Sequence, residues 1–284
     1  MVIQNLGNAV YTTWANGTQE TGRNRTHGNV FFEGNTIYSY GYHFPMAVKS
    51  PWGYLVNGDT YSASTARHQA AVRSAIHGRV KVIIPFSTLR RAGINRSTIE
   101  LVYTEPDRFI PMRCRRPRCT NMFGGAPIHT HDQHLLGQSV IRVGDTHYLS
   151  GLDSTMRGQG YFLAQLPYPA LNVAAAEDIL KPAIVQQAPS YLRQGEWFFI
   201  PTEKPLVPVE IAGAIQKHIL LSNRNPQRLQ QHRATNYIEA NGQVYVSGTI
   251  RHISGDHKML PLKGWCTAHE NTEIRSFRAD GRVD

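Results

Sequence analysis

The 284-residue sequence has few cysteines and no long apolar run. Its cysteines are Cys114, Cys119 and Cys266, and an odd count in a chain of this length argues against a disulfide scaffold and for a reducing compartment. No apolar run approaches the roughly 20 residues that span a bilayer. The first residues also lack the basic and apolar regions of a signal peptide. We therefore expect an intracellular protein with no membrane-spanning segment.

Several motifs of well-known enzyme classes are also missing. The sequence contains no Walker loop, no Rossmann glycine pattern, no Gly-x-Ser-x-Gly elbow and no His-Glu-x-x-His pair. ATP hydrolysis, dinucleotide redox chemistry and α/β-hydrolase chemistry are therefore not expected. Hydrophobic residues make up 41% of the chain, which is typical of a folded protein rather than a disordered one.

The chain carries a strong positive charge of +10, and the charge is concentrated in one segment. Residues 90 to 118 hold eight arginines against three acidic residues, which is +5, half of the total. A local basic concentration favours a polyanionic partner such as DNA or RNA, and the alternative is a basic surface that only aids solubility. The residues predicted to contact nucleic acid are Arg90, Arg91, Arg113, Arg115, Arg116 and Arg118, with Tyr40 as a base-stacking side chain.

Turn signals predict the fold class. The dipeptides Gly34-Asn35, Asn57-Gly58, Gly144-Asp145 and Asn241-Gly242 each separate two β-rich runs. These residues accept the positive φ angles of the tight turns that join antiparallel strands. We therefore predict an α+β protein built from antiparallel hairpins with a few helices.

Helices and domain boundaries are marked less clearly. One helix is predicted from a cap at Ser64-Thr65 to His77, before Gly78, and others over 172–181 and 210–221. Residues 191–200 read as one buried strand inside a proline-rich stretch. We therefore interpret the chain as one domain over residues 1–284. The alternative is a larger N-terminal part, 1–205, and a smaller β-rich part, 206–284.

A cysteine–histidine cluster, Cys114, Cys119, His129 and His134, has the residue types of a zinc site. The two cysteines and the two histidines are each separated by four residues, so each pair can close on one tetrahedral ion. If zinc binds there, it is structural, and the arginines between the cysteines are placed for phosphate contacts. The alternative is a solvated loop with free thiols.

A second group of histidines lies near the C-terminus. Residues 251–258 read as a hairpin with a four-residue loop, which places His252 and His257 close enough to share a metal or a phosphate. Further candidate ligands are His232, Cys266 and His269. Few carboxylates are nearby in sequence, which argues against magnesium. The alternative is ordinary surface histidines on a hairpin.

The run from Tyr38 to His43 is the third candidate. Strand periodicity puts Tyr38, Tyr40 and Tyr42 on one face, where they can stack on bases or pack in the core. His43 and His68 can pair as acid and base in a cleft. The alternative for His68 is a core histidine, because it lies on the apolar face of the predicted helix.

Two segments, residues 28–45 and 193–200, resemble uncharacterised proteins of bacteriophages and other mobile elements. The resemblance implies a setting in the bacterial host cytoplasm or the virion. It implies no activity and no site residues.

Three functions follow as hypotheses. The first is a nucleic-acid-binding protein with a structural zinc. The second is a nuclease or phosphoesterase that uses His43, His68, His252 or His257, with or without a metal. The third is a phage structural or host-takeover protein whose partner is another protein.

Overall fold

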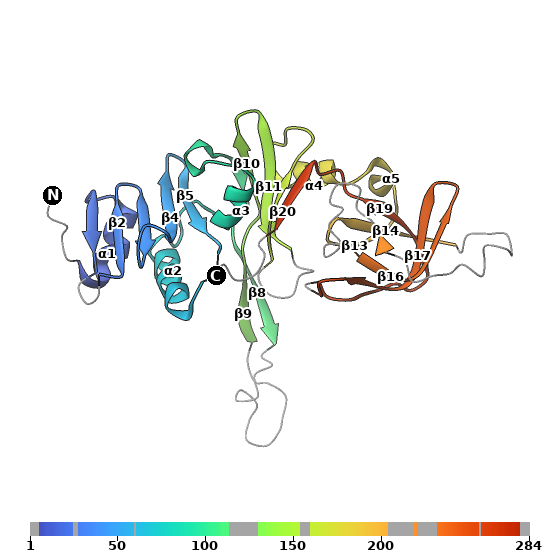
Figure 1. Cartoon of the computed structure of the whole chain (residues 1–284), viewed down its shortest axis with the longest axis horizontal. Helices are drawn as coiled ribbons and strands as arrows, with labels where there is room; N and C mark the ends of the chain where they lie inside the picture. The colour runs from blue at the N-terminus through green and yellow to red at the C-terminus, as the bar shows by residue number, and fades with distance from the viewer. Residues whose placement is uncertain are drawn as a thin grey trace, which may run out of the picture.

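The computed structural model describes residues 6–24, 28–59, 61–113, 130–153, 160–203, 219–220, 232–255 and 257–278. Three β-sheets follow one another along the longest axis of the molecule, and a two-stranded arm projects from the middle (Figure 1). Almost all strand pairs are antiparallel, and the helices are short. The protein is therefore an α+β protein rich in hairpins, as its turn signals predict.

The N-terminal sheet has six strands in chain order. They are β1 (Thr21–Arg23), β2 (Val30–Glu33), β3 (Thr36–Ser39), β4 (Pro45–Ser50), β5 (Gly53–Asn57) and β6 (Lys81–Ile84). The short helix η1 (Gly7–Ala9) precedes α1 (Val10–Asn16), and α2 (Ala63–Ala75) connects β5 to β6, which run parallel. Both α1 and α2 pack on one face of the sheet, where Trp14 and Phe32 are fully buried.

The middle sheet has five strands in the order β20-β12-β11-β10-β7. They are β7 (Glu100–Thr104), β10 (Ser139–Val143), β11 (Thr146–Leu152), β12 (Tyr161–Gln165) and β20 (Arg275–Arg278). One face shares a core with the N-terminal sheet and α3 (Phe86–Arg91), which η2 (Arg96–Thr98) follows. The opposite face packs on α4 (Val173–Leu180).

The third sheet holds most of the C-terminal half, after α4 and α5 (Ala183–Gln186). Its strands are β13 (Leu192–Gln194), β14 (Trp197–Thr202), β15 (Ile219–Leu220), β16 (His232–Ala240), β17 (Gln243–His252), β18 (Leu260–Pro261) and β19 (Trp265–Glu270). The order is β13-β14-β19-β17-β16-β15, with β18 beside β17. The sheet has strands on both sides of residue 205, and β20 then returns to the middle sheet. The division into domains stays a prediction.

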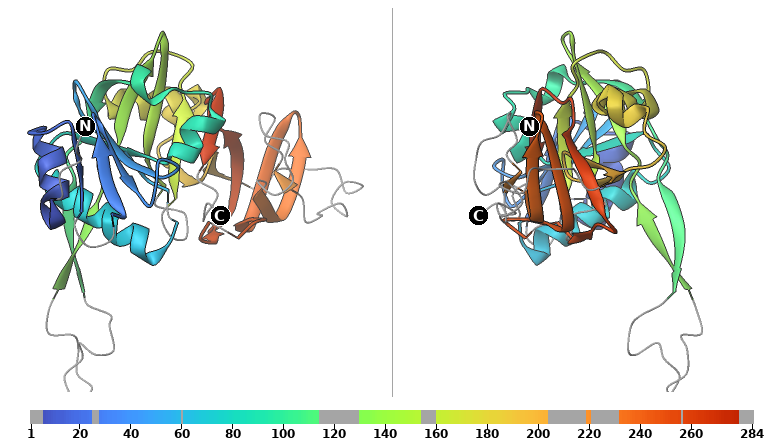
Figure 2. Two further views of the ribbon diagram at one scale, coloured as in Figure 1. Left: turned by 60° about the vertical axis from the view of Figure 1, so that its left-hand side comes forward. Right: turned by 90° about the vertical axis from the view of Figure 1, so that its right-hand side faces the viewer.

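The arm consists of β8 (Arg108–Arg113) and β9 (Thr130–Leu135), paired antiparallel from Arg108↔Leu135 to Arg113↔Thr130. It projects away from the three sheets in both views of Figure 2. The arm thus carries its outer end away from the body of the molecule.

Three of the four predicted hairpins are present, at Gly34-Asn35, Gly144-Asp145 and Asn241-Gly242. The hairpin at Asn57-Gly58 is wrong, because β5 is followed by α2 and not by an antiparallel strand. Asn57 is buried, and its side chain ends the strand. Its Oδ1 accepts hydrogen bonds from the N–H groups of Asp59 and Phe86, and its Nδ2 donates to the Pro45 carbonyl.

The other element predictions differ in detail. Residues 191–200 form two strands, β13 and β14, because Gly195 takes a φ of +58° and turns the chain. The cap of α2 is Ser62, whose Oγ accepts from Thr65 N–H, and α4 begins after Asn172 as expected. In the segment 210–221, Ile219–Leu220 is strand β15, and the other residues lie outside the described part.

Within the described residues, no helix is both long enough and apolar enough to cross a membrane.

Candidate metal centre

Three buried histidines meet at one end of the third sheet. They are His232, His252 and His257, with exposed fractions of 0%, 4% and 2%. One ligand atom of each lies within 4.8 Å of those of the other two. The ring centroids are 4.7 Å apart for His232 and His252, 4.8 Å for His252 and His257, and 5.6 Å for His232 and His257. These residues form what we call the three-histidine cluster.

The register of β16 and β17 places His232 directly opposite His252. From the Asn241-Gly242 turn, Ala240 pairs with Gln243, and regular pairing continues to Asn236↔Ser247. Continued without change, that register would set His232 opposite Arg251. Instead the register shifts by one residue, so Ala234 pairs with Ile250 and His232 with His252.

A β-bulge at Gly248 produces this shift. Gly248 and Thr249 of β17 together face Thr235 of β16, and Gly248 has a φ of +84°. The Thr235 hydroxyl accepts a hydrogen bond from Thr249 N–H at 3.0 Å, which holds the bulge closed. A glycine with positive φ in this position is typical of a bulge that needs a left-handed residue. The bulge therefore puts His232 and His252 side by side on the core face.

The segment after β17 brings the third histidine. The chain turns after His252, where Gly255 N–H donates to the His252 carbonyl at 3.0 Å, and returns beside β17 as β18. Gln194 of β13 is buried, and its Nε2 donates to the carbonyl of Lys258. This contact holds the segment that carries His257 against the β13–β14 hairpin.

Two side-chain oxygens lie close to the Nδ1 atoms of His232 and His252. Oε1 of Glu196 is 3.4 Å from Nδ1 of His232, and Oγ of Ser254 is 2.5 Å from Nδ1 of His252. Glu196 belongs to the β13–β14 turn, and β19 and β17 separate that hairpin from β16 in the strand order. The third sheet is therefore curled, so that this turn reaches His232.

This arrangement suits a transition-metal ion. When Nδ1–H of an imidazole points at an oxygen, the lone pair is on Nε2, and carboxylates commonly orient metal-binding histidines in this way. Zinc binds imidazole nitrogens at about 2.0–2.1 Å, so three such nitrogens lie roughly 3.3 Å apart around one ion. The ligand atoms of the cluster lie within 4.8 Å of one another, so the three side chains have to close slightly to hold one ion. Imidazole also suits copper, iron and nickel.

The other predicted ligands lie elsewhere. Cys266 is packed in the apolar core of the third sheet, and burial raises the pKa of its thiol. His269 Nε2 lies 2.9 Å from the Thr267 hydroxyl, and burial lowers the pKa of its imidazole. Neither belongs to the three-histidine cluster. Cys114, Cys119 and His129 lie outside the described residues, and for His134 only the backbone, in β9, is described.

The predicted tyrosine stripe is interrupted at Tyr40. Tyr38 and Tyr42 do lie together, with ring centroids 5.1 Å apart, but Tyr40 has a φ of +58°. This backbone conformation breaks the strand alternation and sets the Tyr40 ring 5.5 Å from that of His68. His68 Nδ1 lies 2.8 Å from the Ser39 hydroxyl, and burial lowers the pKa of its imidazole, whereas His43 is exposed.

Of the predicted catalytic histidines, His252 and His257 are thus together. His43 and His68 belong to the N-terminal sheet region, at the other end of the molecule (Figure 1).

Among the arginines predicted to contact nucleic acid, Arg90 and Arg91 are exposed in the last turn of α3. Arg113 ends strand β8 of the arm. Arg115, Arg116 and Arg118 lie outside the described residues. Tyr40 is half-exposed at the end of β3, in the N-terminal sheet.

Comparisons of the chain with protein-family models, with curated proteins and with solved structures found no match.

Sequence reasoning missed Glu196, Ser254 and the bulge. The interpretation of residues 191–200 as one strand conceals the turn that carries Glu196. Gly195 is the signal that marks this turn, and Gly248 inside a strand pattern is a recognised bulge signal.

Proposed function

We propose that the protein binds one transition-metal ion, zinc in the first instance, on His232, His252 and His257. The observation that carries the proposal is the meeting of three buried imidazoles whose ligand atoms lie within 4.8 Å of one another. Imidazoles gathered at this distance repel each other when protonated, and a shared cation draws on all three lone pairs. The ion would join β16, β17 and the segment before β18.

The experiment is a calorimetric titration of chelator-treated full-length protein with Zn²⁺. The wild-type protein is expected to bind with high affinity at the cluster, and the His252→Ala/His257→Ala variant is expected to lose this binding event. The matched control is His43→Ala/His269→Ala, which removes two histidines outside the cluster. If both double variants bind zinc as the wild type does, the proposal is wrong.

Metal-dependent cleavage of phosphodiester bonds is a second candidate function. Three protein ligands is the number that catalytic zinc sites use, with water as the fourth. In this role His252 and His257 act as metal ligands and not as a free acid and base. Zinc-loaded protein is expected to cleave labelled DNA or RNA, and His257→Ala is expected to abolish cleavage. No cleavage by the wild type with any of the four metals named above removes this candidate.

Nucleic-acid binding is favoured by a separate observation. Arg90 and Arg91 are exposed at the end of α3, and strands β8 and β9 of the arm stand away from the body of the molecule (Figure 2). Exposed arginines bind backbone phosphates, and a projecting hairpin can follow a groove. We infer that this part of the chain contacts DNA or RNA.

The test is fluorescence anisotropy with labelled DNA and RNA over a range of salt concentrations. Binding is expected to weaken steeply with salt, because phosphate contacts release counterions. Arg90→Ala/Arg91→Ala is expected to reduce the slope of log K against log salt by roughly 1–2. Arg67→Ala, an exposed arginine of α2, is the control. The absence of any binding at low salt would contradict the inference.

A further inference from the structure

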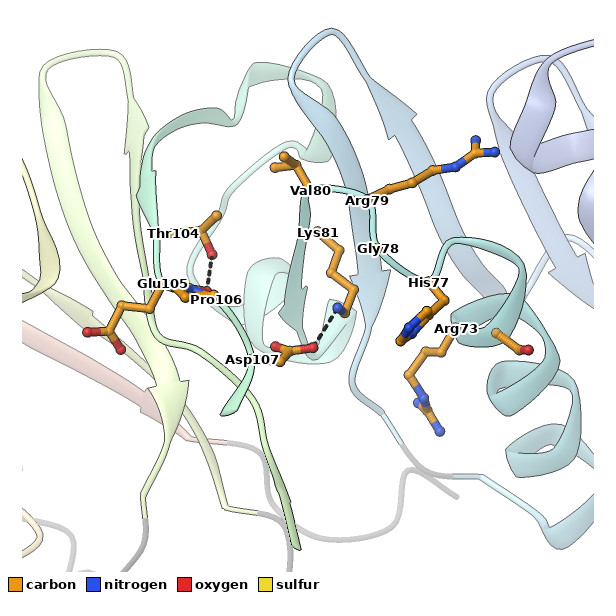
Figure 3. Close-up of a pocket in the computed structure, with 11 residues that line it drawn as sticks. Arg73, His77, Gly78, Arg79, Val80, Lys81, Thr104, Glu105, Pro106 and Asp107 are labelled. Carbon is orange, nitrogen blue, oxygen red and sulfur yellow. Dashed lines mark hydrogen bonds and ion pairs between the residues drawn. The ribbon is translucent and has the colours of Figure 1, made fainter. Parts of the chain in front are cut away.

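A cavity of about 740 Å³ lies in the N-terminal half of the molecule, apart from the three-histidine cluster. Its walls are the end of α2, the start of β6 and the connection from β7 to β8 (Figure 3). Small-molecule sites in proteins commonly have volumes of roughly 300–1,000 Å³. The cavity is therefore large enough for a ligand the size of a mononucleotide.

The acidic side chains in the wall are paired with basic groups. Asp107 accepts from the ammonium of Lys81 at 2.6 Å and from Gly137 N–H at 3.2 Å. Glu105 lies 3.5 Å from the guanidinium of Arg108. These contacts offset the two negative charges, so neither carboxylate opposes an anionic ligand with its full charge.

The cavity wall also contains the basic side chains of Arg73 and His77. Arg73 lies in the last turn of α2, His77 lies just beyond the end of the helix, and both line the cavity. Figure 3 shows the His77 ring on the side of the Lys81–Asp107 pair and the Arg73 side chain close to it, both at the end of α2. Within the described part of the chain, neither side chain takes part in a hydrogen bond or ion pair.

Arg79, another basic residue of the cavity wall, differs from Arg73 and His77 in its contacts. Its guanidinium donates to the Ala15 carbonyl, the Tyr54 hydroxyl and Oδ1 of Asn16 at 2.6–2.8 Å, and it points away from the cavity (Figure 3). Arg79 therefore fixes α1 against β5. Arg73, in contrast, is half-buried at the cavity wall. Burial raises the pKa of Tyr161, and the positive charge of Arg73 lowers it, which offsets part of that increase.

We propose that this cavity binds a phosphate monoester, with the guanidinium of Arg73 and the imidazole of His77 as its main contacts. A guanidinium offers two parallel N–H donors that match phosphate oxygens, and an imidazole adds a third donor. The cavity also opens beside the arm, because β8 begins at Arg108, directly after Asp107. The phosphate can belong to a free mononucleotide or to the end of a nucleic-acid strand.

The experiment uses the full-length protein and several probes. A nucleoside 5′-monophosphate and inorganic phosphate are titrated by calorimetry against the matching nucleoside without phosphate. Oligonucleotides labelled at the 3′ end are compared with a 5′-phosphate and with a 5′-hydroxyl. The monophosphate is expected to bind and the nucleoside is not, and Arg73→Gln is expected to weaken binding at least tenfold.

Three variants make the result specific. Arg67→Gln removes the same charge from α2 outside the cavity and is expected to bind as the wild type does. Arg73→Lys keeps the charge without the two-donor fork and is expected to give intermediate affinity, which also shows that position 73 tolerates change. His252→Ala/His257→Ala is expected to bind normally, so this site and the metal site can fail separately.

The outcomes are distinguishable. A preference for the 5′-phosphorylated strand assigns the site to nucleic-acid ends, whereas binding of the free monophosphate alone assigns it to small ligands. Both support the proposal. It is overturned if neither the monophosphate, inorganic phosphate nor the phosphorylated strand binds at millimolar concentration. It is equally overturned if Arg73→Gln and Arg67→Gln have the same effect.

Discussion

The carboxylate of Glu196 lies beside His232, and its position explains how one side chain can tune a metal site without binding the metal. Oε1 of Glu196 lies 3.4 Å from Nδ1 of His232, and a carboxylate on the outer nitrogen of a metal-binding imidazole commonly orients the ring and makes its ligating nitrogen more basic. The turn itself is held by Asn271 N–H, which donates to the Glu196 carbonyl at 2.8 Å. Glu196 is thus a positioning residue in this account.

Glu196→Gln is expected to weaken zinc binding by about 10–100-fold while leaving one ion bound at saturation, because the neutral amide has the same shape without the charge. Competition with a chromogenic chelator measures the change. Glu239→Gln, an exposed carboxylate on β16, is the control. An affinity within twofold of the wild type in Glu196→Gln would show that the carboxylate has no such role.

His68 gives a pH dependence that is separate from the metal. Burial lowers the pKa of its imidazole, so the folded protein favours the neutral form below the ordinary value of 6.5. The unfolded chain takes up a proton near that value while the folded chain does not. The contribution of His68 to stability is therefore present above pH 6.5 and is lost as the pH falls through the lowered folded pKa.

His68→Gln is accordingly expected to flatten part of the fall in unfolding free energy between pH 7 and pH 5. Urea unfolding of chelator-treated protein measures it, with His43→Gln, at an exposed histidine, as the control. Identical pH profiles for wild type and His68→Gln would rule out this linkage.

At the scale of elements, the bulge in β17 decides which residues meet. The Asn241-Gly242 turn sets the position of the hairpin and can be recognised in the sequence. An uninterrupted register from that turn, however, would pair His232 with Arg251. The shift at Gly248 is what brings His232 to His252. The pattern of strand residues is enough to predict the hairpin. It does not predict the one-residue shift in register, because a glycine within a strand can lie in a regular stretch or in a bulge.

Gly248→Ala tests the bulge without altering a ligand. An added Cβ would lie 2.7 Å from Cβ of Thr235, on a backbone with φ of +84°. We expect a loss of about 1–3 kcal/mol in unfolding free energy and at least tenfold weaker zinc binding. Chemical denaturation and metal titration measure the two effects.

Gly144→Ala is the matched control. Gly144 also has positive φ, at +58°, in the β10–β11 turn, and an added Cβ there has no neighbour within 4 Å. It is expected to cost about 1 kcal/mol of stability and to leave zinc binding unchanged. Unchanged metal affinity in Gly248→Ala would mean that the register shift does not hold the cluster together.

Other elements show the same division between what a local pattern can and cannot predict. Asn172 as a cap and Gly144-Asp145 as a turn act through neighbouring residues, so the sequence predicts them. Asn57-Gly58 resembles a hairpin turn locally. No hairpin forms there, because the Asn57 side chain accepts a hydrogen bond from the N–H of Phe86, 29 residues away, and helix α2 follows the strand. The triad of His232, His252 and His257 likewise depends on contacts between β13, β16 and β17 that no short segment encodes.

For the whole molecule, the two candidate sites belong to different parts of the row of sheets. The three-histidine cluster belongs to the third sheet, and the cavity beside Arg73 belongs to the N-terminal sheet and the base of the arm. Strand β20, the last in the described part of the chain, pairs with β12 of the middle sheet. This separation is why variants at one site are expected to leave the other intact.

The most direct measurement is the metal content of protein purified without chelators, by elemental analysis of three forms. They are the wild type, Cys114→Ser/Cys119→Ser and His252→Ala/His257→Ala. We expect about one zinc less per chain in the histidine variant than in the wild type, and at least about one zinc retained in the cysteine variant. Metal retained in full by the histidine variant, or lost entirely from the cysteine variant, would contradict a metal centre on His232, His252 and His257.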